Sequence, residues 1–513
     1  MQSAESNTVN ESLGSFLERQ CGYYSDLTAM LHMRDGRPVK ITWGKLSLIA
    51  HEVAGGLIKK GIRPGDRVCI FGDSSIEWAI VWLAVQLCGA IDVAWENTRD
   101  VQQLIRIIEY ADARFVFCDH EQVLAGLAAK AELSVLHMSW TMPGQFNHDK
   151  IRSLYDLRAQ GRRILGLRSR LHQMRLSRMA ADPACVFLKQ SPAEGDSIPL
   201  GIVHSSHSLI RNLRDYAMTM TVAESDLILS TVPLWHSAGR LALVFALYKA
   251  ASLFPSDNAR FLKDVFHQAP SILFCQPDNL QAYYQRVANG RLREGTLKIM
   301  LRRMYLQIGY AWNRSWQFLH KGQDDERNNT WVFLASTIAL LLPLWLILGP
   351  FKALGDQFFL KPIRRGLGGR LRLIICGGNK LNARLDDFFN TAQIPVFESY
   401  WLSEVGFVAA GRIIESVGQA DHLARGSVGS LLPGIALRLV DHKGNDVSNS
   451  FYSKGQIYLQ ARSVMLGYLH EPRLTAETLD ENGWLKTRDR GYLISTGDLV
   501  LLPRQSRFKS VLD

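Results

Sequence analysis

The segment GIRPGDRVCIFGDSSIEWAIVWLAVQLCGA, from Gly61 to Ala90, decides the fold class of this chain. Its first part is a turn followed by an apolar run typical of a buried strand, and its second part is an amphipathic helical pattern that stops at Gly89. A strand followed at once by a helix is the unit of a mostly parallel sheet with right-handed crossovers.

The same alternation extends in both directions along the chain. A helical pattern covers Leu46 to Lys60, ARFVFCD is another apolar strand, and strands again alternate with helices between Asp226 and Gly406. From Gly426 onward the pattern changes to short alternating strands with turn signals. We therefore expect an α/β protein with subdomains at residues 1–180 and 181–425, the second with an insertion at about 296–355, and a small β-rich subdomain at 426–504.

Composition supports a folded protein with several cores. The chain has 513 residues, of which 47% are apolar and 21% charged. Its seven cysteines are scattered, so we expect buried thiols in a reducing compartment. The first residues lack a basic region followed by an apolar run, so no secretory signal is expected.

The net charge of +11 is concentrated in arginine-rich segments. Six arginines lie between Arg162 and Arg178, and others occur at Arg302, Arg303 and around Arg364 to Arg372. Nucleic acid is one possible partner of such patches, and an anionic membrane surface is another. Because no aromatic and basic platform for bases is evident, we expect no nucleic-acid partner.

The stretch WVFLASTIALLLPLWLILGPF, Trp331 to Phe351, favours the membrane. It contains no charged residue, and about 20 apolar residues are enough to cross the hydrocarbon core. The alternative is a buried core helix. A complete span would separate two halves of one α/β domain, so we expect a re-entrant hairpin bent at Pro343 or a helix lying in one leaflet.

Two basic segments have the character of interfacial helices. Met300, Met304, Ile308 and Trp312 follow one another at helical spacing beside arginines. Within the Arg162–Arg178 segment another apolar stripe lies among arginines; a stripe of this kind is more often core than membrane-facing. We expect a monotopic, membrane-associated protein on the cytoplasmic face.

Five motifs follow one another along the chain: ITWGKLSLIAHEVAGGLIKKGIRPGDRVCIFG, TVPLWHSAG (Thr231–Gly239), LGGRLRLIICGG (Leu367–Gly378), GSVGSLLPG and VMLGYLHEPRLTAETLDENGWLKTRD. They resemble motifs of long-chain fatty-acid CoA ligases, which belong to the adenylate-forming, AMP-binding superfamily. The resemblance implies the large N-terminal domain of that superfamily. It places residues 505–513 at a hinge remnant, so the small C-terminal domain and its lysine are expected to be absent.

The resemblance also implies the site residues. It assigns catalytic roles to Glu404, His236 and Ser403, with Glu404 also holding Mg²⁺. The nucleotide-binding positions that it implies are Gly377, Gly378, Tyr400, Asp489, Arg504 and Gly201. A second candidate for the ribose motif, Thr496-Gly497-Asp498, is expected to be a turn between strands.

The phosphate loop departs from the family pattern TSGTTGxPKG. This chain has KQSPAEGDSIPLG from Lys189 to Gly201, in which Leu200 replaces the lysine and Glu194 and Asp196 add negative charge. Like charges repel a polyphosphate. In the motif YGxTE, Trp401 replaces the glycine. Recognition of the nucleoside is therefore largely kept, while handling of the triphosphate is altered.

Two functions remain open from the sequence. One is a ligase that uses ATP, Mg²⁺ and CoA to convert a long-chain fatty acid to acyl-AMP and then to a thioester, with an acyl carrier protein or a separate C-terminal domain as a possible partner. The other is an inactive pseudo-enzyme that binds acyl groups or nucleotides at the membrane and organises a lipid pathway.

Overall fold

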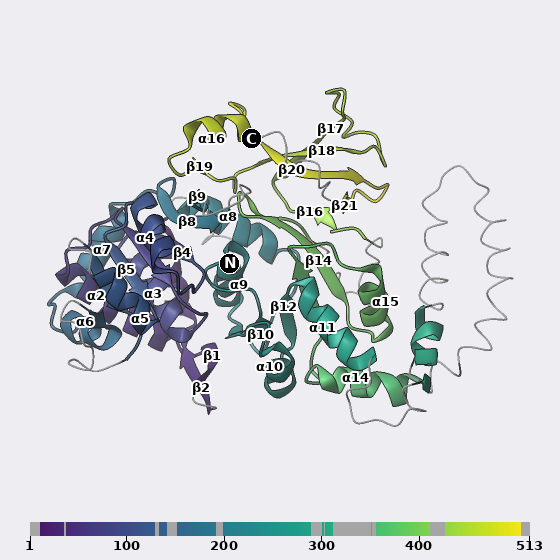
Figure 1. Cartoon of the computed structure of the whole chain (residues 1–513), viewed down its shortest axis with the longest axis horizontal. Helices are drawn as coiled ribbons and strands as arrows, with labels where there is room; N and C mark the ends of the chain where they lie inside the picture. Colours follow the sequence, from purple (N-terminus) through teal and green to yellow (C-terminus); the bar gives the residue numbers. More distant parts are fainter. Residues whose placement is uncertain are drawn as a thin grey trace.

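The computed structural model of the chain (Figure 1) describes residues 11–34, 37–128, 133–140, 151–190, 198–288, 300–301, 303–310, 350, 355–410 and 426–503. Arg504, the phosphate-loop residues 191–197 and all of the apolar stretch 331–351 except Pro350 lie outside these ranges. Among the described residues, no helix has the length and apolar character needed to cross a membrane.

The larger of two mixed sheets has nine strands, and its central strands are parallel. In spatial order they are β16 (Ser430–Leu431), β15 (Gly406–Ala410), β14 (Val396–Leu402), β13 (Leu373–Gly377), β12 (Ile272–Cys275), β10 (Leu227–Ser230), β11 (Ser252–Pro255), β1 (Thr28–Arg34) and β2 (Arg37–Thr42). The expected parallel sheet is therefore present, with antiparallel strands at both edges.

The second sheet has eight strands. In spatial order they are β19 (Gly467–Tyr468), β9 (Leu200–Ser205), β8 (Pro183–Lys189), β4 (Ile91–Trp95), β3 (Arg67–Phe71), β5 (Phe115–Cys118), β6 (Ser134–His137) and β7 (Arg152–Ser153). Alternate residues of β3 face opposite cores, because Val68 and Ile70 belong to one buried cluster and Cys69 and Phe71 to another.

Helices cover both faces of these sheets (Figure 1). One continuous core joins the facing surfaces of the two sheets to α1 (Leu13–Tyr23), α2 (Trp43–Lys59), α3 (Ile76–Leu87), α8 (Ser206–Ala217) and α9 (Ser237–Tyr248). The outer face of the eight-stranded sheet packs against α4 (Val101–Tyr110) and α5 (Glu121–Ala128). The outer face of the nine-stranded sheet packs against α10 (Phe261–Gln268), α11 (Pro277–Ala288), the π-helix η2 (Asp356–Leu360), α14 (Lys361–Gly366) and α15 (Ala383–Thr391). The other helices are α6 (Leu154–Gly161), α7 (Leu167–Leu176) and α16 (Pro472–Thr478), and residues 303–310 are helical as well.

Helix α3 differs from the amphipathic helix expected from the sequence. It begins where the Ser75 side chain accepts a hydrogen bond from the Trp78 amide, and all of its residues are buried. Its polar residues are satisfied inside the protein: Glu77 accepts from the Trp140 indole, and Gln86 donates to Asp92. The helix lies between other helices and the sheet, so it has no solvent face.

The β-rich segment contributes to all three sheets. Its own four-stranded sheet consists of β17 (Ile435–Val440), β18 (Gly455–Ala461), β20 (Trp484–Leu493) and β21 (Leu499–Leu501). However, β16 and β19 extend the two large sheets. In the same way β1 and β2 come from residues 1–180 but belong to the nine-stranded sheet, so the sheets cross the subdomain boundaries expected from the sequence.

The seven cysteines are all free and buried. Burial raises the pKa of the thiols of Cys21, Cys88 and Cys118 to about 12, which keeps them protonated and unreactive near neutral pH. They act as small apolar residues of the core.

Candidate functional site

Two adjacent parallel strands, β13 and β14, bring the first candidate residues together. Gly377 ends β13 and pairs with Ser399 of β14, so the turn at Gly378 and the segment Tyr400 to Glu404 leave the same edge of the sheet. In open α/β sheets, ligands bind outside the carboxyl ends of the strands. This edge is therefore the place where a nucleotide or acyl group would be held.

Glu404 lies in the turn between β14 and β15 and is buried. Its backbone carbonyl accepts a hydrogen bond from the Met465 amide at 2.8 Å, which fixes the turn. Its Oε1 accepts from Lys189 Nζ at 3.0 Å and from the Tyr468 hydroxyl at 3.4 Å. Its Oε2 is buried without a hydrogen-bond partner among the described residues. One carboxylate oxygen is thus neutralised by the protein and the other is left for a ligand.

Lys189 lies directly across the β8–β9 hairpin from Leu200, the residue that replaces the lysine of the family pattern. The two residues are direct partners in the antiparallel pairing of β8 with β9, so their side chains leave the same face of that hairpin. The ammonium group that the family pattern places at position 200 is therefore present on the opposite strand, where it contacts Glu404. A lysine directly across a hairpin from the missing lysine is a signal that the sequence contained and that motif comparison did not use.

Ser403 is held by a histidine that sequence reasoning missed. His204, on β9, donates from Nε2 to the Ser403 carbonyl at 2.7 Å, and its Nδ1 contacts the Ser208 hydroxyl at 3.1 Å. Burial lowers the pKa of His204 to about 4, so the ring is neutral near pH 7. The Ser403 hydroxyl lies 3.4 Å from the Ser237 hydroxyl at the start of α9. No local sequence pattern indicated the role of His204.

His236 caps helix α9. Its Nδ1 accepts a hydrogen bond from the Ala238 amide at 3.2 Å, which leaves the proton of the neutral ring on Nε2. Burial, together with the positive charge of Lys189, lowers the pKa of His236 to about 4. The side chain is therefore a neutral hydrogen-bond donor at physiological pH rather than a general base.

Trp401 covers the glycine pair at the end of β13. A methyl group on Gly377 would lie 2.5 Å from Cζ3 of the indole and 2.4 Å from the Ser399 carbonyl oxygen, so only glycine fits there. The indole stacks on Phe274, with 5.7 Å between ring centroids and 16° between planes. Gly378 has a φ of 92°, which favours glycine. The indole of Trp401 thus lies directly beside two of the positions that the resemblance assigned to nucleotide binding.

Asp489 and Tyr400 connect the β-rich sheet to this edge. The Tyr400 hydroxyl donates to Asp489 Oδ2 at 2.9 Å, and both residues are buried. The backbone amide of Asp489 donates to the Thr487 hydroxyl. The structure therefore brings the expected ribose-binding carboxylate next to the expected nucleotide-binding tyrosine, although they lie on different sheets. The alternative motif at Thr496–Asp498 is a turn between β20 and β21, as expected.

Gly201 has a structural role in the described residues. Its amide donates to the Tyr110 hydroxyl at 3.2 Å, and its carbonyl accepts from the Leu469 amide at 2.7 Å. A Cβ atom at this position would lie 2.9 Å from the Cβ of Leu469. The glycine lets β19 approach β9, and its amide and carbonyl each form a hydrogen bond within the protein; the nucleotide contact expected for Gly201 stays a prediction.

Comparison with known proteins agrees with this geometry. A family model described as AMP-binding enzyme matches residues 17–469. The chain is 22% identical over 492 residues to the long-chain-fatty-acid–[acyl-carrier-protein] ligase AEE15, chloroplastic, of Arabidopsis thaliana, covering 92% of this chain and 65% of that protein. It is 24% identical to the long-chain-fatty-acid–CoA ligase FadD15 of Mycobacterium bovis, covering 92% of this chain and 70% of that protein. The chain thus spans about two thirds of the length of these relatives.

Solved structures show the same fold. The crystal structure of the anthranilate CoA ligase AuaEII with anthranoyl-AMP superposes with a TM-score of 0.68 at 16% identity, covering 97% of this chain and 77% of that one. The N-terminal domain of FACL13 from Mycobacterium tuberculosis gives a TM-score of 0.66 at 16% identity, covering 96% of this chain and 100% of that one.

Proposed function

Because the chain belongs to the AMP-binding enzyme family, we propose that it is an adenylate-forming acyl ligase whose substrate is a long-chain fatty acid. In this reaction a carboxylate oxygen attacks the α-phosphorus of ATP, the bond to pyrophosphate breaks, and the resulting acyl-AMP is passed to a thiol. The observation that carries the proposal is Glu404, a buried carboxylate with one oxygen neutralised by Lys189 and the other without a partner in the described residues.

The residues present fit the Mg²⁺ that the family implies. Glu404 Oε2 would supply one ligand, and no cluster of three His, Cys, Asp or Glu side chains able to hold a metal occurs in the described ranges. Mg²⁺ is commonly bound by one or two carboxylates together with substrate phosphates and water. When bound, it would supply positive charge for the phosphate oxygens, and Glu404 would be the protein residue that holds it.

The remaining residues would bind and orient the substrates. Lys189 places its charge on the face of the β8–β9 hairpin that borders Glu404, where it would attract phosphate oxygens. His236 would donate from Nε2 to the carboxylate of the acyl substrate, because its Nδ1 is already used by the helix cap. Tyr400 and Asp489 would position the nucleoside, with Trp401 shaping the space beside Gly377.

We further propose that the thiol acceptor is CoA or the thiol of an acyl carrier protein. Both acceptors rest on the family membership and on the relatives whose names include them. We also propose that the protein is held at the cytoplasmic face of a membrane, with residues 331–351 in one leaflet; the absence of any charge in that stretch supports this.

A second candidate function is favoured by Trp401. Its indole lies beside the glycine pair at the nucleotide edge, and Leu200 replaces the phosphate-loop lysine. If these changes exclude a triphosphate, the protein is a pseudo-enzyme that binds acyl groups or acyl-AMP without making it. This candidate predicts adenylate binding without turnover, whereas the ligase predicts both.

One pair of measurements separates the candidates. Binding of a non-hydrolysable acyl-adenylate analogue is measured by calorimetry, and ATP–pyrophosphate exchange is measured with a panel of fatty acids. For the ligase we expect tight analogue binding and exchange that falls ~10²–10³-fold in Glu404→Gln. Glu477→Gln, an exposed carboxylate on α16, is the matched control and leaves exchange unchanged.

The other outcomes decide against the ligase. Analogue binding without exchange, also in the presence of a C-terminal domain from a relative, identifies the pseudo-enzyme. If neither the analogue nor ATP binds at millimolar concentration, both functions are excluded. Exchange that survives Glu404→Gln removes Glu404 from the proposed role.

A further inference from the structure

Helix α7 has an outward face that the site does not use. Leu171 and Arg175 point inward and are buried, and the apolar stripe expected to be interfacial packs toward the main core. The opposite side carries the exposed helical residues Arg168, Ser169, His172 and Leu176, and two further exposed residues flank the helix, Leu165 before it and Met179 after it. The apolar stripe of this segment is therefore part of the core, as stripes of this kind more often are.

Three large apolar side chains on this face are unusually exposed. Leu165 is 97% exposed, Met179 is 73% exposed and Leu176 is 61% exposed. Isolated exposed apolar residues are ordinary, but three within fifteen residues form a patch. Nothing among the described residues covers them.

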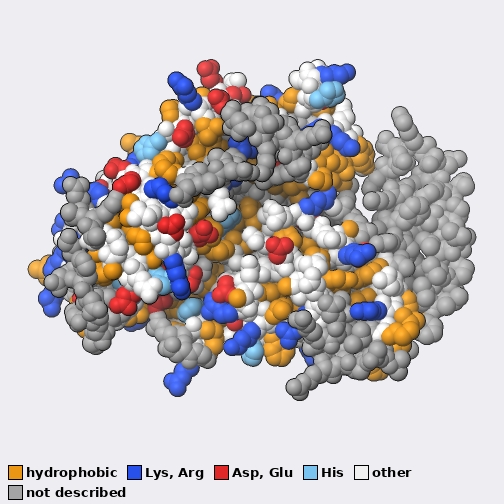
Figure 2. All heavy atoms as spheres, viewed as in Figure 1, with side chains coloured by type: hydrophobic (Ala, Val, Ile, Leu, Met, Phe, Trp, Pro, Cys, Tyr) orange, Lys and Arg blue, Asp and Glu red, His pale blue; other side chains and the backbone are white. Residues whose placement is uncertain are grey.

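Unpaired cations surround the patch. Arg163, Arg168 and Arg170 are exposed and form no ion pair with a described residue. The chain has no carboxylate between residues 161 and 181. Figure 2 shows Lys and Arg side chains with hydrophobic side chains among them along the left edge of the molecule, where Figure 1 places α6 and α7.

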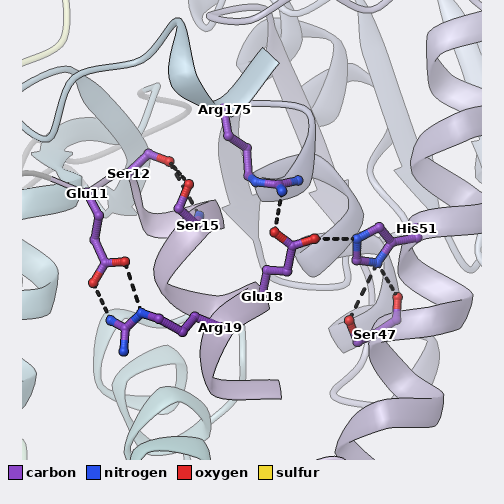
Figure 3. A network of polar contacts seen from close by, with 8 residues as sticks. All are labelled: Glu11, Ser12, Ser15, Glu18, Arg19, Ser47, His51 and Arg175. Atoms are coloured by element: carbon purple, nitrogen blue, oxygen red, sulfur yellow. Dashed lines mark hydrogen bonds and ion pairs between the residues drawn. The ribbon is translucent and has the colours of Figure 1, made fainter. Parts of the chain in front are cut away.

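Arg175 fixes this orientation. It is the buried arginine of the helix, and its guanidinium donates to Glu18 of α1, which also contacts His51 Nε2 at 2.8 Å (Figure 3). His51 Nδ1 in turn bonds the Ser47 carbonyl at 2.8 Å. Although burial acts to raise it, the pKa of Glu18 is lowered by His51 and Arg175, so the carboxylate stays charged and keeps α7 docked. The network holds one side of α7 against α1 and α2, which leaves the cationic and apolar side facing solvent.

We propose that this α6–α7 surface, made of Leu165, Leu176, Met179, Arg163, Arg168 and Arg170, docks on an anionic lipid bilayer. Arginines bind lipid phosphates while leucine and methionine side chains enter the interfacial region. The apolar tips favour lipid over nucleic acid, which would need stacking platforms. The inference deepens the membrane association proposed above and rests on it, but it is independent of the ligase activity.

The surface is tested by sedimentation of the full chain with vesicles. Vesicles of phosphatidylcholine alone are compared with vesicles containing 30% phosphatidylserine, a composition chosen for the assay, at low and high salt. Each basic residue near an anionic surface contributes roughly fivefold to partitioning, so Arg163, Arg168 and Arg170 changed together to Gln should lower binding to anionic vesicles by about 100-fold. Changing Leu165, Leu176 and Met179 to Ser should also weaken binding.

A charge-matched control uses exposed lysines of the four-stranded sheet. Lys443, Lys454 and Lys486 changed together to Gln remove the same charge and should leave binding unchanged. Equal losses in both triple variants would mean that net charge alone acts, which overturns the proposal. The proposal is also overturned if the Arg163, Arg168 and Arg170 triple variant binds anionic vesicles as well as the wild type does, or if equimolar duplex DNA displaces the protein from the vesicles.

The vesicle assay also separates this surface from residues 331–351. Insertion of an uncharged segment does not require anionic lipid, so it is measured by binding to phosphatidylcholine vesicles, which Leu340, Leu341 and Leu342 changed to Asp should abolish. If only the leucine-to-aspartate variant loses binding to anionic vesicles, the proposed α6–α7 surface is refuted. If only the arginine-to-glutamine variant loses it, the surface is supported, whatever the ATP–pyrophosphate exchange shows.

Discussion

The buried ion pair between Arg240 and Asp92 allows one prediction to be worked out from the structure. Asp92, on β4, is 0% exposed and Arg240, on α9, has a side chain that is 3% exposed. The carboxylate also accepts from the Trp82 indole at 3.0 Å and from Gln86 at 2.7 Å. Arg240 lies over the rings of Trp78 and Trp82 and donates from Nε to the Leu234 carbonyl. The pair therefore joins β4 of the eight-stranded sheet to helix α9 within the central core.

Arg240→Met should cost about 3–5 kcal/mol of the free energy of unfolding, because it leaves a carboxylate buried without a cation. Burial raises the pKa of Asp92, and Arg240 opposes that shift. In the variant the folded-state pKa should rise further above the unfolded value. The folded variant then binds a proton at low pH that the unfolded chain does not bind, so the destabilisation caused by Arg240→Met should be smaller at pH 5 than at pH 8.

The assay is urea unfolding followed by tryptophan fluorescence. Arg240→Met is compared with the double variant that also carries Asp92→Asn, which removes the buried charge but keeps an acceptor for Trp82. The double variant should recover about 2 kcal/mol, since a neutral amide costs less to bury than a charge. The exposed pair Arg260–Asp257 is the control, and Arg260→Met should cost less than about 1 kcal/mol.

Two results would refute the reasoning. If Arg240→Met costs no more than Arg260→Met, the pair does not experience a desolvated environment. If Asp92→Asn gives no recovery in the Arg240→Met background, the loss comes from packing against the aromatic rings and not from the unpaired charge.

Three further predictions concern the site and the membrane. Burial raises the pKa of Glu398 from its ordinary value of 4.5 to about 7, so the folded state keeps a proton that the unfolded state has already lost. The free energy of unfolding should therefore fall as the pH rises from 4.5 through 7. Glu398→Gln should remove this pH dependence in urea titrations between pH 5 and 8. An acyl-adenylate analogue should raise the melting temperature more than ATP does, and Asp489→Ala should shrink this effect; equal shifts for both ligands would contradict it. The wild-type protein should fractionate with membranes and require detergent, and full solubility without detergent or lipid would contradict the proposed membrane association.

The alternation of strands and helices was sufficient to determine the α/β class. In apolar runs such as Val68–Phe71 every side chain avoids water only if both faces of the strand are buried, as in a parallel sheet covered on both sides. Turn residues mark where each run ends. From Gly426 onward the change to short alternating strands likewise predicted a β-rich segment. Both features depend on residues that are close together in the sequence, so their periodicity can be read from the sequence alone.

The membership of the sheets was decided by tertiary structure. Nothing local to β1 and β2 shows that they extend the nine-stranded sheet beyond β11, or that β19 pairs with β9, because edge pairing depends on which surfaces meet after folding. Helix α3 is a similar case, since only the packing around it shows that its polar residues are buried and paired.

For the candidate site, the sequence determined which residue types are available and where the family pattern is broken. It predicted roles for Glu404, Ser403, His236 and Asp489, and it showed that Leu200 replaces a lysine. Only the tertiary structure places Lys189 on Glu404, because that contact depends on where strand β8 lies relative to a turn 215 residues away. The charge at a site is a sum over groups that are close in space, and proximity of this kind is not encoded in any single motif.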